Sequence, residues 1–271
     1  KRINRITGVE MKITHTILVL TLMMVASVSL AQSNSDKGLE IMTEVDVRDE
    51  GFKDFSAEIS MVLEDNDGNK SVRMMDVKNL EVKNDGDKRL LVFKEPSDVS
   101  GTALLTYSHI IKDDEQWLFL PALKRVKRIS SSNKSGPFVG SEFAYEDMLS
   151  QEAEKYDHFY ITEETFNGLD CFVVERKPRY QSSGYNKQKV WIDKEQYRYQ
   201  KIEYYDHQDA HLKTLVLSKY EQFLDKYWRA KEMVMTNHQT QKSTTMYWKD
   251  FSFQNGYDDS AFTKSVLKRS R

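Results

Sequence analysis

Alternation of apolar and polar residues with a period of two is the feature that most constrains the fold of this chain. From Phe55 to Leu63 the odd-numbered positions are apolar and the even-numbered positions are mostly polar. Successive side chains of a strand point to opposite faces, so this stretch predicts a strand with one buried face. Further strands are predicted at 70–82, 89–93, 101–107, 116–120, 156–162, 169–176, 187–193, 197–205, 213–223, 228–236 and 243–253.

Turn-forming residues separate these stretches at short, regular intervals. Asp65–Asn69 and Asn167-Gly168 are examples. Strands at this spacing indicate one antiparallel sheet or barrel rather than βαβ units. No linker rich in Pro, Gly or Ser divides residues 32–271, so we expect a single, mainly β domain there.

Two short helices are predicted beside the strands. Asp36 is expected to cap the first helix, which ends at Gly51. Its apolar positions at roughly helical spacing are Leu39, Met42 and Val45. Ser141 is expected to cap the second helix, which runs through residues 144–151.

Residues 11–31 have the pattern of a cleavable secretory signal peptide, and residues 1–10 lie upstream of it. Lys12 is followed by an uncharged run, 13–30, and Ala31 ends a small-residue cleavage site before Gln32. A membrane-spanning anchor is the alternative, but a span needs about 20 apolar residues and this run is shorter and broken by hydroxyl side chains. Gln32 and not a cysteine stands directly after the cleavage site, so the lipid-anchor signal of bacterial lipoproteins is missing and we expect a soluble periplasmic protein.

Charge and cysteine content narrow the function further. Removing residues 1–31 takes four basic and one acidic residue from the totals of 40 and 42, leaving 36 and 41. This mildly acidic balance argues against nucleic acid as a partner. Cys171 is the only cysteine, so no internal disulfide forms, and its apolar surroundings favour a buried, inert thiol.

Several sequence blocks resemble the outer membrane lipoprotein-sorting family, which is LolA/LolB-like. These are FKEP (93–96), GTAL (101–104), QWLFLPALKRVKRI (116–129), GSEFAYED (140–147), WIDK (191–194) and KIEYYD (201–206). The resemblance implies an open, strongly curved antiparallel β half-barrel with a helical lid. It also implies an apolar hollow that receives acyl chains.

Binding an acyl chain needs a dry apolar concavity, which a curved sheet with one apolar face supplies. For each residue proposed for its wall, ordinary core packing is the alternative. The candidates from the strands are Phe55, Ile59, Met61, Leu63, Phe93, Leu104, Trp117 and Phe119. Residues 138–149 form either a mobile lid or a fixed connector, with Phe143, Tyr145 and Met148 facing the hollow.

A basic run at 122–129 allows two interpretations. Its cations are Lys124, Arg125, Lys127 and Arg128. They are suited to anionic lipid head groups or to an acidic partner surface. The alternative is a solvated edge strand whose basic residues discourage aggregation.

Catalytic and metal-binding patterns are weak. His207 and His211 have a metal-like spacing, but they lie in a predicted hairpin turn without a third ligand. No nucleophile elbow, phosphate-binding loop or dinucleotide fingerprint is present. We therefore expect no enzyme activity, no cofactor and no metal.

Two functions remain after these exclusions. The first is a monomeric periplasmic carrier that holds a lipid or lipoprotein acyl chain, moves it toward the outer membrane and exchanges it with an inner-membrane export transporter. The alternative is a non-catalytic accessory subunit that docks on such a transporter and carries nothing.

Overall fold

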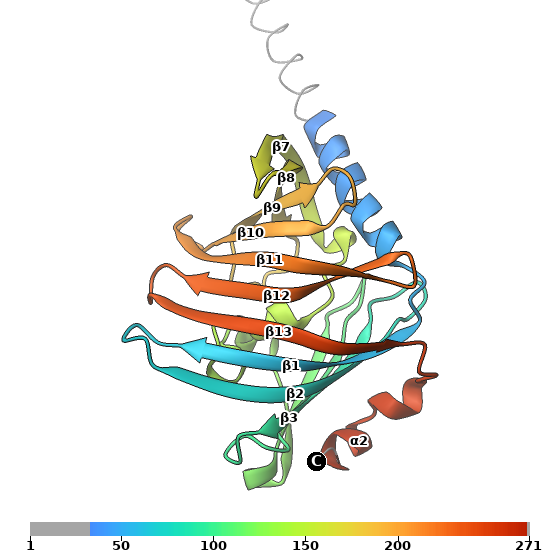
Figure 1. Ribbon diagram of the computed structural model, residues 1–271, viewed down its shortest axis with the longest axis vertical. Helices are drawn as coiled ribbons and strands as arrows, with labels where there is room; N and C mark the ends of the chain where they lie inside the picture. The colour runs from blue at the N-terminus through green and yellow to red at the C-terminus, as the bar shows by residue number, and fades with distance from the viewer. Residues whose placement is uncertain (1–32, 270–271) are drawn as a thin grey trace, which may run out of the picture.

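The computed structural model describes residues 33–269, and thirteen strands in this range form one antiparallel sheet (Figure 1). The predicted signal peptide, residues 11–31, lies outside the described residues. The strands are β1 (Asp54–Glu64), β2 (Lys70–Leu80), β3 (Lys88–Glu95), β4 (Ala103–Tyr107), β5 (Glu115–Leu120), β6 (Arg125–Arg128), β7 (Tyr156–Phe166), β8 (Leu169–Pro178), β9 (Lys187–Asp193), β10 (Tyr199–Tyr205), β11 (His211–Phe223), β12 (Tyr227–Asn237) and β13 (Lys242–Phe253).

The strand order makes the sheet an open, curled half-barrel. It runs β6-β5-β4-β3-β2-β1-β13-β12-β11-β10-β9-β8-β7, so β6 and β7 form its two edges. Residues far apart in sequence meet where β1 pairs with β13, with Met61 opposite Met246. The strongly curved antiparallel fold predicted from the sequence is confirmed.

Short helical turns interrupt the loops between strands. They are η1 (Pro121–Leu123), η2 (Ser131–Asn133), η3 (Phe138–Gly140), η4 (Tyr145–Met148), η5 (Ala153–Lys155) and η6 (Asp259–Phe262), followed by the α-helix α2 (Lys264–Arg269). In Figure 1 the green segment that includes η3 and η4 lies behind the strands. That side is the concave face of the sheet.

The first helix is longer than predicted, and its buried face differs. Residues 33–49 are already helical where the described residues begin, so Asp36 lies inside the helix and does not cap it. Ile41, Met42 and Val45 are buried, whereas Leu39 is 45% exposed because it is off the face that they share. A Cβ added to Gly38 would meet backbone atoms of β7 at 2.8–3.0 Å, which explains the absence of a side chain where the helix touches the sheet.

The second predicted helix is wrong in extent. Only η4 forms within residues 144–151, and Ser141 does not cap it. The Ser141 hydroxyl donates to the Phe138 carbonyl at 2.7 Å, while the Asp147 carboxylate accepts from the Ala144 backbone N–H at 2.7 Å. This segment bonds to itself in short turns and to the sheet, instead of forming a continuous helix.

The described residues form three apolar clusters, and the two larger ones lie on opposite faces of the sheet. The larger of these two occupies the concave face and includes buried residues of the first helix and of most strands. The smaller of these two lies on the convex face of β3–β5 and includes Phe262 and Leu267 from the C-terminal elements η6 and α2. No element was predicted from the sequence for residues 254–269.

Candidate functional site

A cavity of about 1670 Å³ lies within the half-barrel. It is larger than the ~300–1,000 Å³ of most small-molecule sites. Its floor consists of side chains from the concave face, and its outer part is bounded by loops at one end of the sheet. The apolar and aromatic residues of the floor include Phe55, Ile59, Met75, Leu91, Ile202, Leu215, Leu217, Met233, Met246, Trp248 and Phe251.

Residues 138–149 cover part of the concave face and are held there by side chains from several strands. Gln116 of β5 donates to the Tyr145 carbonyl at 2.8 Å, and Arg89 of β3 donates to the Met148 carbonyl at 3.2 Å. Lys213 of β11 donates to the Glu142 carbonyl at 3.0 Å and forms an ion pair with Asp147 at 2.8 Å. The segment therefore forms a cover over the hollow that polar contacts attach from both sides.

The structure places eight of the ten predicted wall residues in or against the concave cluster. Phe55, Ile59, Phe143 and Met148 line the cavity. Met61, Phe93 and Leu104 are fully buried beside it, and Leu63 packs against it partly exposed. Of the residues predicted to face the hollow from the lid, Tyr145 makes an edge-on contact with Phe138 at the cluster's margin.

Trp117 and Phe119 do not belong to the wall of the hollow. Both belong to the convex cluster, and Trp117 stacks edge-on against Tyr107 with ring centroids 5.0 Å apart. Their neighbours on β5, Leu118 and Leu120, belong to the concave cluster instead. The sequence prediction assigned β5 to the wrong face because both of its faces are apolar, so alternation does not distinguish them.

The sequence prediction missed the contribution of β11–β13 to the floor. Leu217, Met233, Met246 and Trp248 line the cavity from these strands. Their signal was the same period-two alternation that identified the first strand. The indole N–H of Trp248 is buried and has no hydrogen-bond partner among the described residues, which leaves one donor at the floor for a ligand.

Ionisable groups surround the outer part of the cavity. Burial raises the pKa of Asp46 to about 7 and that of Asp87 to about 6. The pKa of Glu152 is raised to about 8, mainly by burial and to a smaller extent by repulsion from Asp87 and Asp46. The guanidinium of Arg229 lies 5.4 Å from the Phe55 ring, where the charged rim meets the apolar floor. The cavity is thus amphipathic along its depth.

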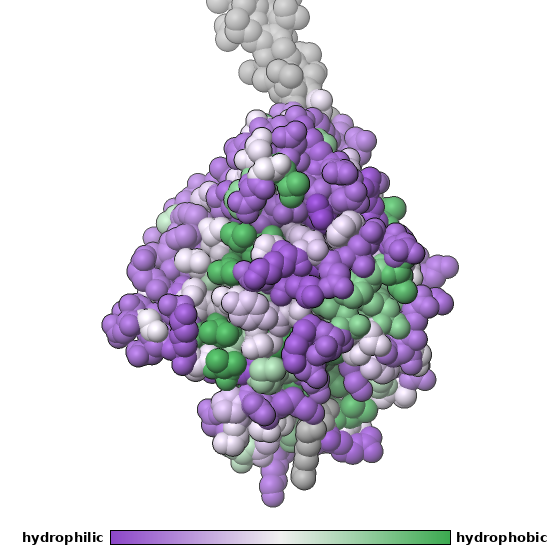
Figure 2. Space-filling model, in the orientation of Figure 1, coloured by the Kyte–Doolittle hydropathy of each residue, from purple (hydrophilic) through white to green (hydrophobic). Residues whose placement is uncertain are grey.

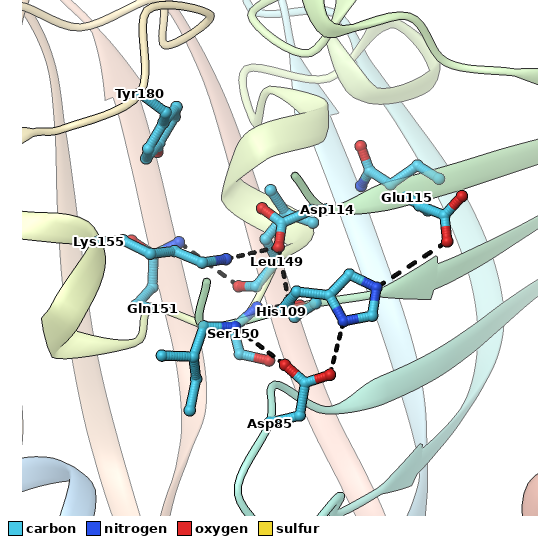
Figure 3. Close-up of polar contacts among 12 residues, drawn as sticks. Asp85, His109, Asp114, Glu115, Leu149, Ser150, Gln151, Lys155 and Tyr180 are labelled. Atoms are coloured by element: carbon cyan, nitrogen blue, oxygen red, sulfur yellow. Dashed lines mark hydrogen bonds and ion pairs between the residues drawn. The ribbon is translucent and has the colours of Figure 1, made fainter. Parts of the chain in front are cut away.

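A polar cluster beside this rim fixes the loop between β4 and β5 (Figure 3). His109 Nδ1 lies 2.7 Å from Asp85 Oδ2, and Asp114 accepts from the His109 backbone N–H at 2.8 Å. Lys155 pairs with Asp114 at 2.5 Å, and both side chains are more than nine-tenths buried. The Ser150 backbone N–H donates to the Ser108 hydroxyl at 3.0 Å. These contacts join residues 150–155, which follow the cover segment, to the loop between β4 and β5.

Of the two histidines predicted to lie in a turn, His207 lies between β10 and β11, and His211 is the first residue of β11. His207 Nε2 lies 3.1 Å from the Ser183 carbonyl, and His211 Nε2 lies 2.9 Å from the Thr214 hydroxyl. Within residues 33–269, no group of three or more His, Cys, Asp or Glu side chains is arranged to hold a metal ion. Cys171 is a buried free thiol whose pKa is raised by burial.

The basic run forms the edge strand β6 and the turn before it. Arg125 to Arg128 pair with β5 on one side only, at the end of the sheet. Lys124, Arg125, Lys127 and Arg128 are all exposed and lie outside the cavity lining. In the described part of the chain, no helix is both long and apolar enough to cross a membrane.

Solved structures match most of the chain. A crystal structure of an outer membrane lipoprotein-sorting protein domain from Vibrio parahaemolyticus is 56% identical with a TM-score of 0.85, over 87% of this chain and 100% of that chain. A DUF1329 family protein from Desulfovibrio piger is 27% identical with a TM-score of 0.82, over 86% of this chain and 99% of that chain. A LolA superfamily protein from Nitrosomonas europaea shares the fold at 19% identity and a TM-score of 0.68, over 84% and 98%.

A family model described as that of an uncharacterized protein matches residues 85–269. No curated protein matches the chain. The half-barrel described above is therefore shared with relatives over nearly their whole lengths.

Proposed function

Because the chain belongs to the outer membrane lipoprotein-sorting family, we propose that it holds a lipid or the acyl chain of a lipoprotein in its hollow and helps move it toward the outer membrane. The observation that carries this proposal is the cavity of about 1670 Å³ on the concave face. Its floor is apolar, its rim is charged, and its cover is made by the chain's own residues 138–149.

An acyl chain suits this floor on energetic grounds. Each methylene moved from water into an apolar site contributes about 0.8 kcal/mol. Met233 and Met246 supply flexible side chains that adapt to chains of different length or shape. The cavity is large enough for more than one acyl chain, which a lipoprotein with several acyl chains would require.

The rim gives the cargo an orientation. A polar head group placed at the outer part of the cavity, near Arg229, stays in contact with water, whereas the chain attached to it reaches the floor. The donor of Trp248 provides one polar contact at the floor for an ester or amide carbonyl. An amphiphile bound in the opposite direction would place its head group at the apolar floor, away from water.

The cellular setting follows from the family and from the predicted signal peptide. In this proposal the protein works in the periplasm as a non-catalytic monomer, needs no cofactor, and receives or delivers its cargo at an inner-membrane export transporter. The name of the Vibrio relative supports the lipoprotein-sorting part of this role.

Two adjacent residues of β12 allow a matched test. Met233 faces the cavity and Val234 faces the convex side, where it pairs with Thr245. We expect Met233→Lys to weaken uptake of a fluorescent fatty acid at least tenfold, since it places a charge in the apolar floor. Val234→Lys introduces the same charge on the other face and should leave uptake unchanged.

Equal uptake by both variants would contradict carriage in the hollow. Copurification of a membrane transporter with both variants, combined with no uptake by the unaltered protein, would favour the accessory-subunit function.

A further inference from the structure

Seven basic side chains from two distant parts of the sequence meet at one end of the molecule. Four belong to the turn before β6 and to β6 itself, and three belong to α2, which packs against β6. In Figure 1, α2 lies at the lower end of the molecule, below β3. We name this group the basic corner; it consists of Lys124, Arg125, Lys127, Arg128, Lys264, Lys268 and Arg269.

The two chain segments that carry the basic corner, residues 116–141 and 260–269, contain no Asp or Glu, and the nearest acidic residues in sequence are Glu115, Glu142 and Asp259. The whole chain, in contrast, has a net charge of −2. Within residues 33–269, Arg128 has one carboxylate partner, Glu115 at 3.1 Å, and the Lys264 ammonium lies 4.2 Å from the centre of the Trp117 ring. Most of the positive charge is therefore directed to solvent.

Protection of a sheet edge does not account for this arrangement. Basic residues that discourage aggregation need only flank the free edge, as Arg125 and Lys127 do on β6. Arg128 lies opposite Trp117 in the β5–β6 pair, and Lys264 covers the same Trp117 ring, so these cations lie on the convex face. The positive surface continues from the edge onto the face of the sheet.

We propose that the basic corner binds the surface of a bilayer that contains anionic phospholipid. Groups of four to eight Lys or Arg side chains attract such surfaces, each contributing about a fivefold increase in partitioning. Leu123, which is 62% exposed, lies in the turn next to Lys124 and provides an apolar side chain that can enter the interface. A membrane fits this mixture of spread cations and an exposed leucine better than an acidic protein does.

Cosedimentation of the full chain with lipid vesicles tests the proposal. The probes are vesicles of one part phosphatidylglycerol to two parts phosphatidylcholine, and vesicles of phosphatidylcholine alone. We expect binding to the first kind only, with loss of binding at high salt. Arg125→Gln with Lys127→Gln should lower partitioning about 30-fold, since two charges are removed.

A matched control carries the same change of charge elsewhere. Lys70 and Lys242 are exposed at the start of β2 and β13, away from the basic corner. Lys70→Gln with Lys242→Gln should change partitioning less than twofold. The R125Q/K127Q variant should take up the fluorescent fatty acid normally, so vesicle binding and cargo binding are measured independently.

Three results would overturn the proposal. They are equal binding to both kinds of vesicle, equal loss in the two double variants, and binding to an acidic polypeptide such as polyglutamate without any binding to anionic vesicles. The last result would assign the basic corner to a protein partner.

Discussion

The two faces of the sheet are both apolar in places, but only one is filled by the chain itself. On the convex face of β3–β5, η6 and α2 cover the apolar residues, and Phe262, Leu267 and Leu105 are completely buried. On the concave face the first helix and residues 138–149 cover the sheet only in part and leave the cavity. Elsewhere the convex face is mainly hydrophilic, with small hydrophobic patches (Figure 2).

The difference separates residues that stabilise the fold from residues that are available to a ligand. In a filled cluster, the burial of apolar surface stabilises the protein even without a ligand. A hollow lined by similar residues gains the remaining burial only when something occupies it. Substitutions in the convex cluster should therefore change stability, and substitutions in the cavity floor should mainly change binding.

The largest effect is expected at Trp117, which is 5% exposed under α2. Trp117→Ala should lower the free energy of unfolding by about 4 kcal/mol, since it leaves a large space in a filled cluster. Denaturant unfolding measures this change. At temperatures where the variant stays folded, its fatty acid uptake should equal that of the unaltered protein, and reduced uptake would show that Trp117 belongs to the ligand site.

Met233→Ala is the counterpart in the floor. Because Met233 already borders empty space, we expect its truncation to cost less than about 2 kcal/mol, below the usual range for a filled core. Fatty acid uptake should weaken instead. A stability loss as large as that of Trp117→Ala would mean that the floor is packed like ordinary core.

A pH effect is expected at the cover. Glu146 is 3% exposed, and burial, with repulsion from Asp147, raises its pKa from 4.5 to about 7. The folded state therefore binds the Glu146 proton more tightly than the unfolded chain does. Proton binding at Glu146 stabilises the fold fully below pH 4.5, and this stabilisation is lost as the pH rises to about 7.

Glu146→Gln imitates the protonated form. It can still accept from the Gly184 N–H, which is 2.7 Å from Glu146 Oε1, and can donate to the Ser183 hydroxyl. Between acidic and alkaline pH, the free energy of unfolding of the variant should rise by on the order of 3 kcal/mol relative to that of the unaltered protein. Unfolding curves at both ends of this range measure the difference, and parallel pH profiles would refute it.

The smallest effect is expected at Tyr107, whose hydroxyl donates to the Phe262 carbonyl. Tyr107→Phe should cost about 1 kcal/mol by leaving that carbonyl without its partner. Tyr257 packs against the same convex cluster, and its hydroxyl has no hydrogen bond to the described residues. Tyr257→Phe should therefore change stability by less than about 0.5 kcal/mol. Equal costs in thermal unfolding would show that the hydrogen bond does not hold η6 in place.

Most strands could be predicted because alternation and turn residues are local properties. β1, β2 and β9 lie within two residues of their predicted bounds. The face on which each strand packs could not always be predicted, because it depends on residues distant in sequence. In β5 both faces are covered, Trp117 by the C-terminal elements and Leu118 by the concave cluster.

The covers themselves were harder to predict than the sheet. Residues 138–149 have few regular backbone bonds, and their position depends on donors such as Gln116, Arg89 and Lys213 from separate strands. The short α2 has no long apolar repeat and is placed by Phe262 and Leu267 entering the convex cluster. Such contacts have no local sequence signal.

Native mass spectrometry of the protein isolated from the envelope of its own cells, without detergent, tests the central claim most directly. We predict a population whose mass exceeds that of the chain by one or more acyl-bearing molecules, which Met233→Lys removes and Val234→Lys retains. Protein that is always empty, or bound lipid that persists in Met233→Lys, would contradict a role of the hollow in carrying lipid.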